Sequence, residues 1–246
     1  MPLIRTLKDT AKSVPLLGPL AHRWWASYNL WKFHPTQMIQ RRLGGKKAVQ
    51  VVEIGANDGK ANDPIHPLLD RNTQWKALFV EPVPYLFARL KQNYGPDPRF
   101  RFENVAITET AKSMNFYYVS ERAKAALPAL PPWHGELGSF NREHIHKLLP
   151  EFEIDPFIDS AEVQCLPLQV MLDRNDIRSI DLLHIDTEGH DWLILRQLDL
   201  SRYQPTVIFF EHVHLDAQQK AAARQFLAPH YEVIELGNDW LCSRLK

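Results

Sequence analysis

The chain has 246 residues, of which 45% are hydrophobic and 24% charged, enough for one α/β domain with a full core. Its 29 Lys and Arg residues balance 29 Asp and Glu residues, and no basic stripe breaks that balance, which argues against a nucleic-acid partner. Two cysteines cannot form a disulfide framework, and no apolar stretch reaches the roughly 18 residues that span a bilayer, so we expect a soluble cytoplasmic protein.

Residues 1–47 predict an N-terminal helical extension. Apolar and aromatic side chains recur at helical spacing on both sides of a break at Pro15–Pro19, namely Leu3, Leu7, Ala11 and Val14, then Leu20, Trp24, Tyr28 and Trp31. One interpretation is a helix that packs over the core or closes the active site. Another is a helix on a membrane surface or in a homo-oligomer interface, since tryptophan suits both places. The pattern leaves both interpretations open.

From residue 48 the sequence alternates between apolar runs, typical of buried strands, and segments with helical periodicity. Strands are predicted at 48–54, 76–80, 100–107, 114–119, 180–185, 207–210, 231–236 and 240–242. Helices are predicted at 83–94, through Trp192, Leu195 and Leu198, and from a cap at Asp216 to Pro229. This order predicts a doubly wound α/β domain over residues 48–246, with a mainly parallel sheet and ligands at the carboxyl ends of its strands.

Residues 121–160 interrupt the alternation with closely spaced prolines and aromatic side chains. A long insertion in a compact domain is usually a lid or a binding loop. This one is too apolar for a disordered linker. We therefore expect it to form part of a substrate pocket.

The strongest local motif is VEIGANDGK, from Val52 to Lys60. A buried strand that ends in small, turn-prone residues lets a ligand approach the backbone closely. The spacing is E-x-G-x-x-x-G, not the G-x-G-x-x-G of dinucleotide folds, so a nicotinamide-dependent oxidoreductase is the least favoured function. Glu53 suits a cationic ligand without phosphates better than a pyrophosphate.

Two later strand ends add groups that suit a nucleoside. Glu81 closes the second strand, where a carboxylate can accept hydrogen bonds from both hydroxyls of a ribose. Asn104, Val105 and Ala106 lie at the third strand, where a polar group followed by small residues suits an adenine. The alternative structural interpretation is a generic α/β turn with an incidental acid.

A second group of polar residues follows the strand at 180–185. Asp186, Glu188 and His190 come directly after it, and the next strand ends with the sequence EHVH, residues 211–214. If both strand ends stay extended, Asp186 and Glu188 share a face, and so do His212 and His214. A carboxylate or histidine here can act as a base, or the groups can hold a divalent cation such as Mg²⁺. Capping of the next helix and local hydrogen bonds are the structural alternative.

These motifs resemble those of the FkbM family of methyltransferases that use S-adenosylmethionine (SAM). The resemblance covers roughly residues 49–214 and rests on VEIGANDG (52–59), FVEP (79–82), NVAI (104–107), GSF (138–140), DLLHIDTEGHD (181–191) and FFEHVH (209–214). It implies a class I methyltransferase sheet of seven strands with the last strand antiparallel. The family more often has Asp at the position of Glu53 and Val at that of Thr187.

The resemblance also implies roles for particular residues. It implies SAM contacts from Gly55, Ala56, Asn57, Gly59 and Glu81, with Asn104 and Ala106 near the adenine; the neighbouring Glu53, Asp58 and Pro82 complete the predicted cofactor site. Asp186, Glu188, Gly189 and His190 match the family signature after the fourth strand. Together with His212, the side chains of Asp186, Glu188 and His190 form the predicted catalytic group.

The leading functional hypothesis is SAM-dependent O-methylation of a hydroxyl on a sugar, glycan or natural-product acceptor. A base near the cofactor is what such a transfer requires of the protein. The alternative is a non-catalytic SAM-binding protein that docks on another chain or a membrane through its Trp-rich N-terminus. The N-terminus and the insertion match nothing in the resemblance, so the acceptor stays open.

Overall fold

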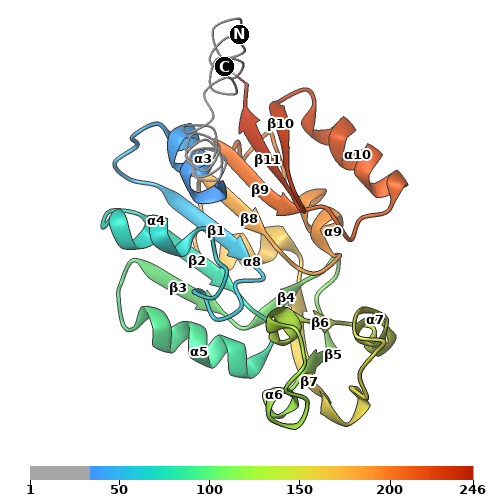
Figure 1. Ribbon diagram of the computed structural model, residues 1–246. Coiled ribbons are helices and arrows are strands. Elements are labelled where there is room, and N and C mark those ends of the chain that lie inside the picture. Colours follow the sequence, from blue (N-terminus) through green and yellow to red (C-terminus); the bar gives the residue numbers. More distant parts are fainter. Residues whose placement is uncertain (1–33, 246) are drawn as a thin grey trace, which may run out of the picture.

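Seven strands form the main sheet, and their apolar runs are long because helices cover both faces (Figure 1). The computed structural model describes residues 34–245, so the helices predicted within residues 1–33 lie outside the described part of the chain. The strand order is β10-β11-β9-β8-β1-β2-β3. The strands are β1 (Gln50–Ile54), β2 (Lys76–Val80), β3 (Phe100–Glu103), β8 (Leu182–Ile185), β9 (Val207–Glu211), β10 (Tyr231–Leu236) and β11 (Asp239–Arg244).

The directions of these strands confirm the predicted fold class. Strands β3, β2, β1, β8 and β9 pair in parallel, whereas β11 is antiparallel to both β9 and β10. The sheet is therefore doubly wound, with its last strand reversed. The register sets Glu53 beside His184 of the neighbouring strand, which matters for the site described below.

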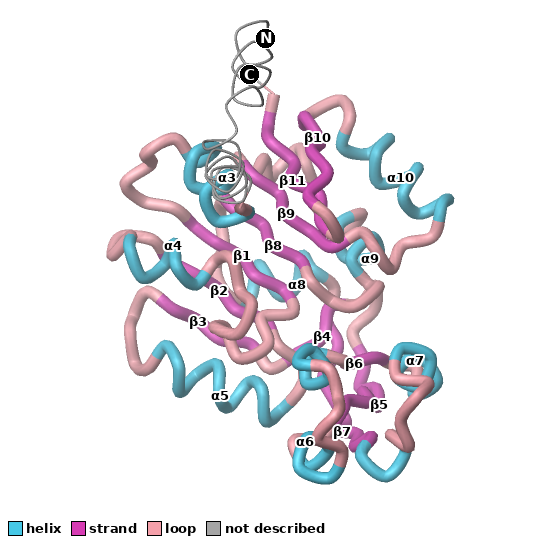
Figure 2. The backbone as a smooth tube through the Cα atoms, in the orientation of Figure 1, coloured by secondary structure: helices cyan, strands magenta, loops and turns pink. Residues whose placement is uncertain are grey.

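Two apolar cores lie on the two faces of the sheet, with the helices arranged around it as in Figure 2. One face packs against α3 (Pro35–Leu43), α4 (His66–Arg71) and α5 (Pro84–Tyr94). The other packs against α8 (Leu168–Arg174), α9 (Asp191–Leu195) and α10 (Ala217–Leu227). Each fully buried Leu, Ile or Val side chain in these cores contributes about 1.5–3 kcal/mol. In the described part of the chain, no helix has the length and apolarity to cross a membrane.

The prediction of one continuous strand at 100–107 is wrong, because this segment forms two strands that belong to two different sheets. The chain leaves the main sheet at Asn104, whose side-chain amide donates to the carbonyls of Glu81 and Pro82. Strand β4 then pairs in parallel with β7. The strand predicted at 114–119 also belongs here. The second sheet has the order β4-β7-β5-β6 and consists of β4 (Val105–Ile107), β5 (Lys112–Val119), β6 (Gly138–Ser139) and β7 (Ile158–Leu166).

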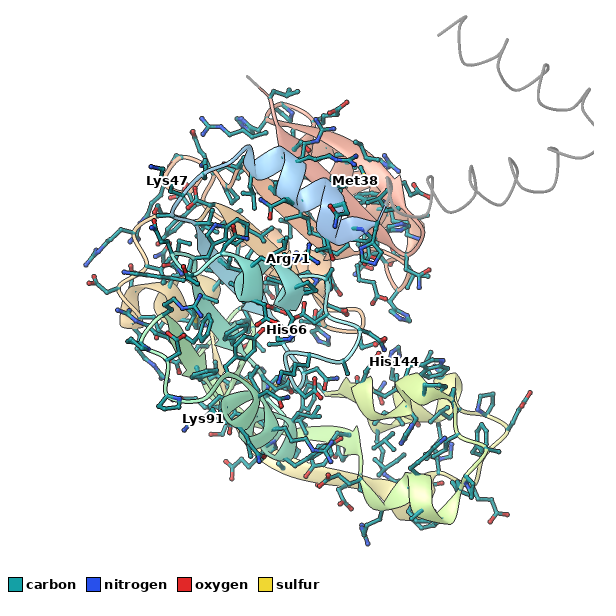
Figure 3. The ribbon with its side chains drawn as sticks, turned by 60° about the vertical axis from the view of Figure 1, so that its left-hand side comes forward. Met38, Lys47, His66, Arg71, Lys91 and His144 are labelled. Carbon is teal, nitrogen blue, oxygen red and sulfur yellow. The ribbon has the colours of Figure 1, made fainter. Side chains whose placement is uncertain are left out.

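The segment 121–160, called the second lobe below, folds around a small apolar core of its own. Ile145, Leu149 and Ile154 are fully buried there, together with Val119 of β5. Its elements are α6 (Arg122–Ala126), η1 (Pro132–Glu136), β6, α7 (Arg142–Leu148) and η2 (Asp155–Phe157). Figure 3 shows this lobe, where His144 of α7 is labelled, projecting from one end of the main sheet.

The start of α10 is as predicted. The Asp216 side chain accepts the backbone N–H of Gln219, and the Gln219 side chain accepts the N–H of Asp216, which forms a capping box. The helix after β8 is shorter than predicted: α9 ends at Leu195, before Leu198. Leu198 is nevertheless buried in the core on this face.

Candidate active site

An open cleft lies over the carboxyl ends of β1, β2 and β8. This is the position that the doubly wound topology predicts for a ligand. Strand β4 and residues 136–140 of the second lobe supply the remaining wall. The cleft residues used below are Glu53, Gly55, Ala56, Asn57, Asp63, Glu81, Pro82, Ala106, Glu136, Phe140, His184, Asp186, Thr187, Glu188 and His190.

The turn after β1 is shaped by its backbone. Gly55 has a φ of 84°, and a Cβ atom there would lie only 1.7 Å from the carbonyl oxygen of Asp186. The N–H groups of Gly55 and Ala56 both donate to the carbonyl of Val80. Asn57 also has a positive φ, of 50°. Only glycine fits at Gly55, so the motif reflects a steric requirement.

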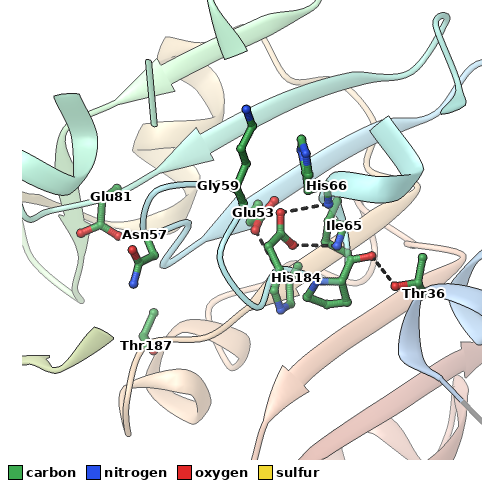
Figure 4. Close-up of polar contacts among 12 residues, drawn as sticks. Thr36, Glu53, Asn57, Gly59, Ile65, His66, Glu81, His184 and Thr187 are labelled. Carbon is green, nitrogen blue, oxygen red and sulfur yellow. Dashed lines mark hydrogen bonds and ion pairs between the residues drawn. The ribbon is translucent and has the colours of Figure 1, made fainter. Parts of the chain in front are cut away.

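The Glu81 carboxylate lies at the end of β2, beside this turn (Figure 4). Its two oxygens accept the N–H groups of Asn57 and Val83, each at 2.8 Å. Burial raises the pKa of Glu81 to about 7, against the lowering effect of these two hydrogen bonds. Each carboxylate oxygen has a further lone pair, so Glu81 can also accept hydroxyl donors.

The other predicted cofactor residues divide into two groups. Glu53, Pro82 and Ala106 line the cleft. Asp58, Gly59 and Asn104 are not among its lining residues. The Asp58 carboxylate accepts the N–H groups of Lys60 and Ala61, and Gly59 packs against the side chains of Leu90 and Tyr94. These three residues therefore brace the turns that form the cleft.

Asp186 stands directly beside the glycine turn. Its N–H donates to the carbonyl of Ile54 at 2.9 Å, and its side chain is open to the cleft. Enclosure of the carboxyl group by surrounding protein raises the pKa of Asp186 to about 8, and the charges of Asp191 and Glu188 act in the same direction. Asp186 therefore holds its proton more tightly than an ordinary aspartate does.

Glu188 and His214 form an ion pair at the edge of the cleft. Glu188 has a φ of 54°, so the chain turns here instead of staying extended. Its carboxylate lies 3.0 Å from Nε2 of His214, which lies 3.6 Å from the Glu211 carboxylate. The hydrogen bond with Glu188 raises the pKa of His214. Burial, with nearby acids such as Asp186, raises the pKa of Glu211 to about 9.

The predicted pairing of His212 with His214 on one face is wrong, because β9 ends at Glu211 and the chain turns there. His212 faces the hairpin between β10 and β11, where its Nε2 lies 3.2 Å from the carbonyl of Gly237. Its ring also packs on Trp240, with 5.0 Å between centroids. His212 is absent from the residues that line the cleft.

His190 does line the cleft and is paired with the second lobe. Its ring meets Phe140 edge-on at 5.3 Å between centroids. Burial lowers the pKa of His190, so its ring is neutral at pH 7 and able to accept a proton.

Helix capping does not occupy Asp186 or Glu188. Asp191 instead accepts the N–H groups of Thr187 and Gly189, at 3.3 and 3.1 Å. This arrangement leaves the two preceding acids available to the cleft. The sequence indicated residues 211–214 as groups that can act as a base or hold a cation, but His212 was chosen for the catalytic group instead of Glu211 and His214. Asp63 was missed.

Comparison with known proteins identifies the family. The Methyltransferase FkbM domain matches residues 53–237, which is most of the chain. The chain belongs to the FkbM methyltransferase family. No functionally curated protein matches this member of the FkbM family significantly.

Solved structures similar to this FkbM chain include two methyltransferases. One is Methyltransferase FkbM from Methylobacillus flagellatus KT, with 12% identity, 80% of this chain and 44% of that chain covered, and a TM-score of 0.49. The other is human Methyltransferase-like protein 13 in complex with SAH, with 13% identity, coverage of 87% and 82%, and a TM-score of 0.44. This chain thus spans less than half the length of the Methylobacillus protein.

The residues of the cleft fit SAM. The Glu81 carboxylate has hydrogen-bond capacity left for the ribose, and the glycine turn exposes backbone to the ligand. The Thr187 hydroxyl is buried without a hydrogen-bond partner. In the described part of the chain, the cleft is lined by carboxylates and histidines and by no Lys or Arg. Such a lining suits a sulfonium cation and offers no cation to bind a pyrophosphate.

Proposed function

We propose that this methyltransferase transfers the methyl group of SAM to a hydroxyl oxygen of a sugar, glycan or natural-product acceptor. The observation that carries the proposal is the position of Asp186, whose backbone packs against Gly55 and whose carboxyl group is open to the cleft. A group that can accept a proton therefore stands beside the turn that fits the cofactor.

Residues on the β1–β2 side of the cleft would hold the cofactor. Glu81 would accept its ribose hydroxyls, while Gly55, Ala56 and Asn57 would contact it through the backbone. SAM supplies an electrophilic methyl group on a sulfonium, so an oxygen acceptor needs alignment and removal of its proton. The second requirement falls to the β8–β9 side of the cleft.

Asp186 is the proposed proton acceptor. In the proposed transfer, the acceptor oxygen would gain the methyl group, S-adenosylhomocysteine (SAH) would be released, and the hydroxyl proton would pass to the Asp186 carboxylate. A pKa of about 8 suits this role, because a base works best when its pKa is near the working pH. His190 lines the same cleft, and Glu188, which also lines it, is paired with His214, so these groups are proposed to take the proton on.

The second lobe supports a polyhydroxylated acceptor. Glu136 and Phe140 come from residues 121–160 and line the cleft opposite the main sheet. An aromatic ring with a carboxylate beside it offers a sugar both an apolar surface and a hydrogen-bond acceptor. The lobe is therefore proposed as the wall of the acceptor site.

A divalent cation such as Mg²⁺ is a further element of the proposal. Glu188, Glu211 and His214 each offer one ligand atom, and these atoms lie within 4.8 Å of one another. A cation there would lower the pKa of a bound hydroxyl and orient a diol. Turnover that is lost with EDTA and restored by Mg²⁺ would support this element, and turnover unaffected by EDTA would remove it.

The test is methyl transfer from radiolabelled SAM to a panel of methyl glycosides, polyketide alcohols, amines and thiols. Asp186→Asn should bind SAH with unchanged affinity yet lose turnover by more than about 100-fold, the size of a lost general base. His214→Gln should lower turnover more than its matched control His212→Gln, because His214 pairs with the cleft residue Glu188 whereas His212 faces the β10–β11 hairpin. Transfer only to nitrogen or sulfur, or full activity in Asp186→Asn, contradicts the proposal.

A further inference from the structure

A second group of ionisable side chains lies in the wall of the cleft, and two of its three members are buried. Glu53 comes from β1, His184 from β8, and Asp63 from the loop before α4. One ligand atom of each lies within 4.8 Å of the other two. The three residues are 131 positions apart at the extremes, so only the folded sheet and loop bring them together.

The fold holds each of these side chains in place. Glu53 and His184 are register partners in the sheet, and the His184 ring stacks on Phe209 at 5.3 Å between centroids. The Asp63 carboxylate accepts the N–H groups of Ile65 and His66, at 2.6 and 2.9 Å (Figure 4). The donor set is therefore rigid before any ligand arrives, which favours binding.

The Glu53 carboxylate lacks a partner outside this group. The residue is only 1% exposed, and its Oε2 has no hydrogen bond. Its other oxygen lies 3.3 Å from Nδ1 of His184. A buried carboxylate oxygen without a partner costs free energy. An additional ligand at this point would remove that cost.

A second cavity gives access to the group. It is an open depression beside the first turn of α3, and Asp63 and His184 lie on its wall. Asp186 and Asp239 line the same cavity and add negative charge, which Lys60 partly offsets. A small cation could therefore enter from solvent without passing through the main cleft.

We propose that Glu53, Asp63 and His184 bind one divalent cation, with Mn²⁺ or Zn²⁺ as the preferred class. Carboxylate oxygens suit Mn²⁺, and a set of carboxylate oxygens with an imidazole nitrogen suits Zn²⁺. The separation of 3.3 Å between the Glu53 oxygen and the His184 nitrogen also fits two ligands on one metal. The cation ties the loop at 61–64 to β1 and β8 and so fixes the floor of the cleft. This inference is independent of the proposed acceptor.

The experiment is titration with Mn²⁺, followed by electron paramagnetic resonance and by thermal melting, without SAM. It uses the wild type and a Glu188→Gln background, which disables the other ligand trio. We expect one Mn²⁺ per chain in that background. Asp63→Asn and His184→Gln, each added to it, should weaken binding at least tenfold and abolish the rise in melting temperature.

Each of the two added substitutions tests the assignment by itself, provided that circular dichroism shows a folded chain. Mn²⁺ affinity that is unchanged in both added variants would falsify the site. Absence of binding at millimolar Mn²⁺ in the folded Glu188→Gln chain would also overturn it.

Discussion

The two sides of the cleft are built by different means. On the β1–β2 side the backbone sets the shape, through the positive φ of Gly55 and the N–H that Asn57 donates to an acid. On the β8–β9 side the side chains set the charge, since Glu188 and Glu211 flank His214. A steric requirement fixes residue identity at one position, whereas a charge cluster depends on chain segments that meet only in the folded molecule.

The largest effect is expected from a substitution in the glycine turn on the β1–β2 side. Gly55→Ala places a Cβ 1.7 Å from the Asp186 carbonyl and requires a φ of 84° that alanine disfavours. We expect SAH affinity to fall by more than about 100-fold, with lower thermal stability. Gly135→Ala is the matched control, because a Cβ there meets no atom within 4 Å. Equal behaviour of the two variants in calorimetry and melting would contradict the steric account.

A smaller effect is expected from Glu81 on that side. Glu81→Gln keeps the shape of the side chain but replaces one acceptor oxygen by a donor, which conflicts with the N–H of Asn57 or Val83. SAH binding should weaken by more than about tenfold, or about 1.4 kcal/mol. Calorimetric titration measures it, and unchanged affinity would remove the ribose role of Glu81.

The acids on the β8–β9 side of the cleft should make the folding stability depend on pH. Folding raises the pKa of Asp191 to about 7, Asp186 to about 8 and Glu211 to about 9, mainly by burial. The unfolded chain, with carboxyl pKa values near about 4, binds fewer protons between these limits. Stability is therefore greatest on the acid side of this window and falls as pH rises from 6 to 9.

Melting temperatures across this pH range measure the fall, which should amount to several degrees. Glu211→Gln removes one titrating group with little change of shape, so its curve should be flatter than that of the wild type. Parallel curves for the two proteins would show that folding does not raise the pKa of Glu211.

The smallest effect concerns the loop that carries His214. Asp216 caps α10 directly after that loop. Asp216→Ala should cost about 1 kcal/mol of unfolding free energy, or about 2–4 °C in melting temperature. SAH affinity should not change, because the loss lies on the side away from the cofactor. A weaker SAH complex would show that the two sides are coupled.

The main sheet was predictable from the sequence because its strands are buried on both faces and appear as apolar runs. The departure at Asn104 was not, since it depends on carbonyls of Glu81 and Pro82, which lie more than 20 positions away. The glycine turn and Glu81 were predictable because their constraint is local. Asp63 was missed, and His212 was predicted in place of Glu211 and His214, because these residues meet their partners only through sheet register and loop closure.

The most direct test of the account is isothermal titration of the purified protein with SAH, with and without Mg²⁺. We expect micromolar binding with one site per chain in both conditions, since Glu81 and the glycine turn need no metal. Absence of binding by folded protein would contradict the cofactor site. That result would favour a non-catalytic role in which the chain docks on a partner.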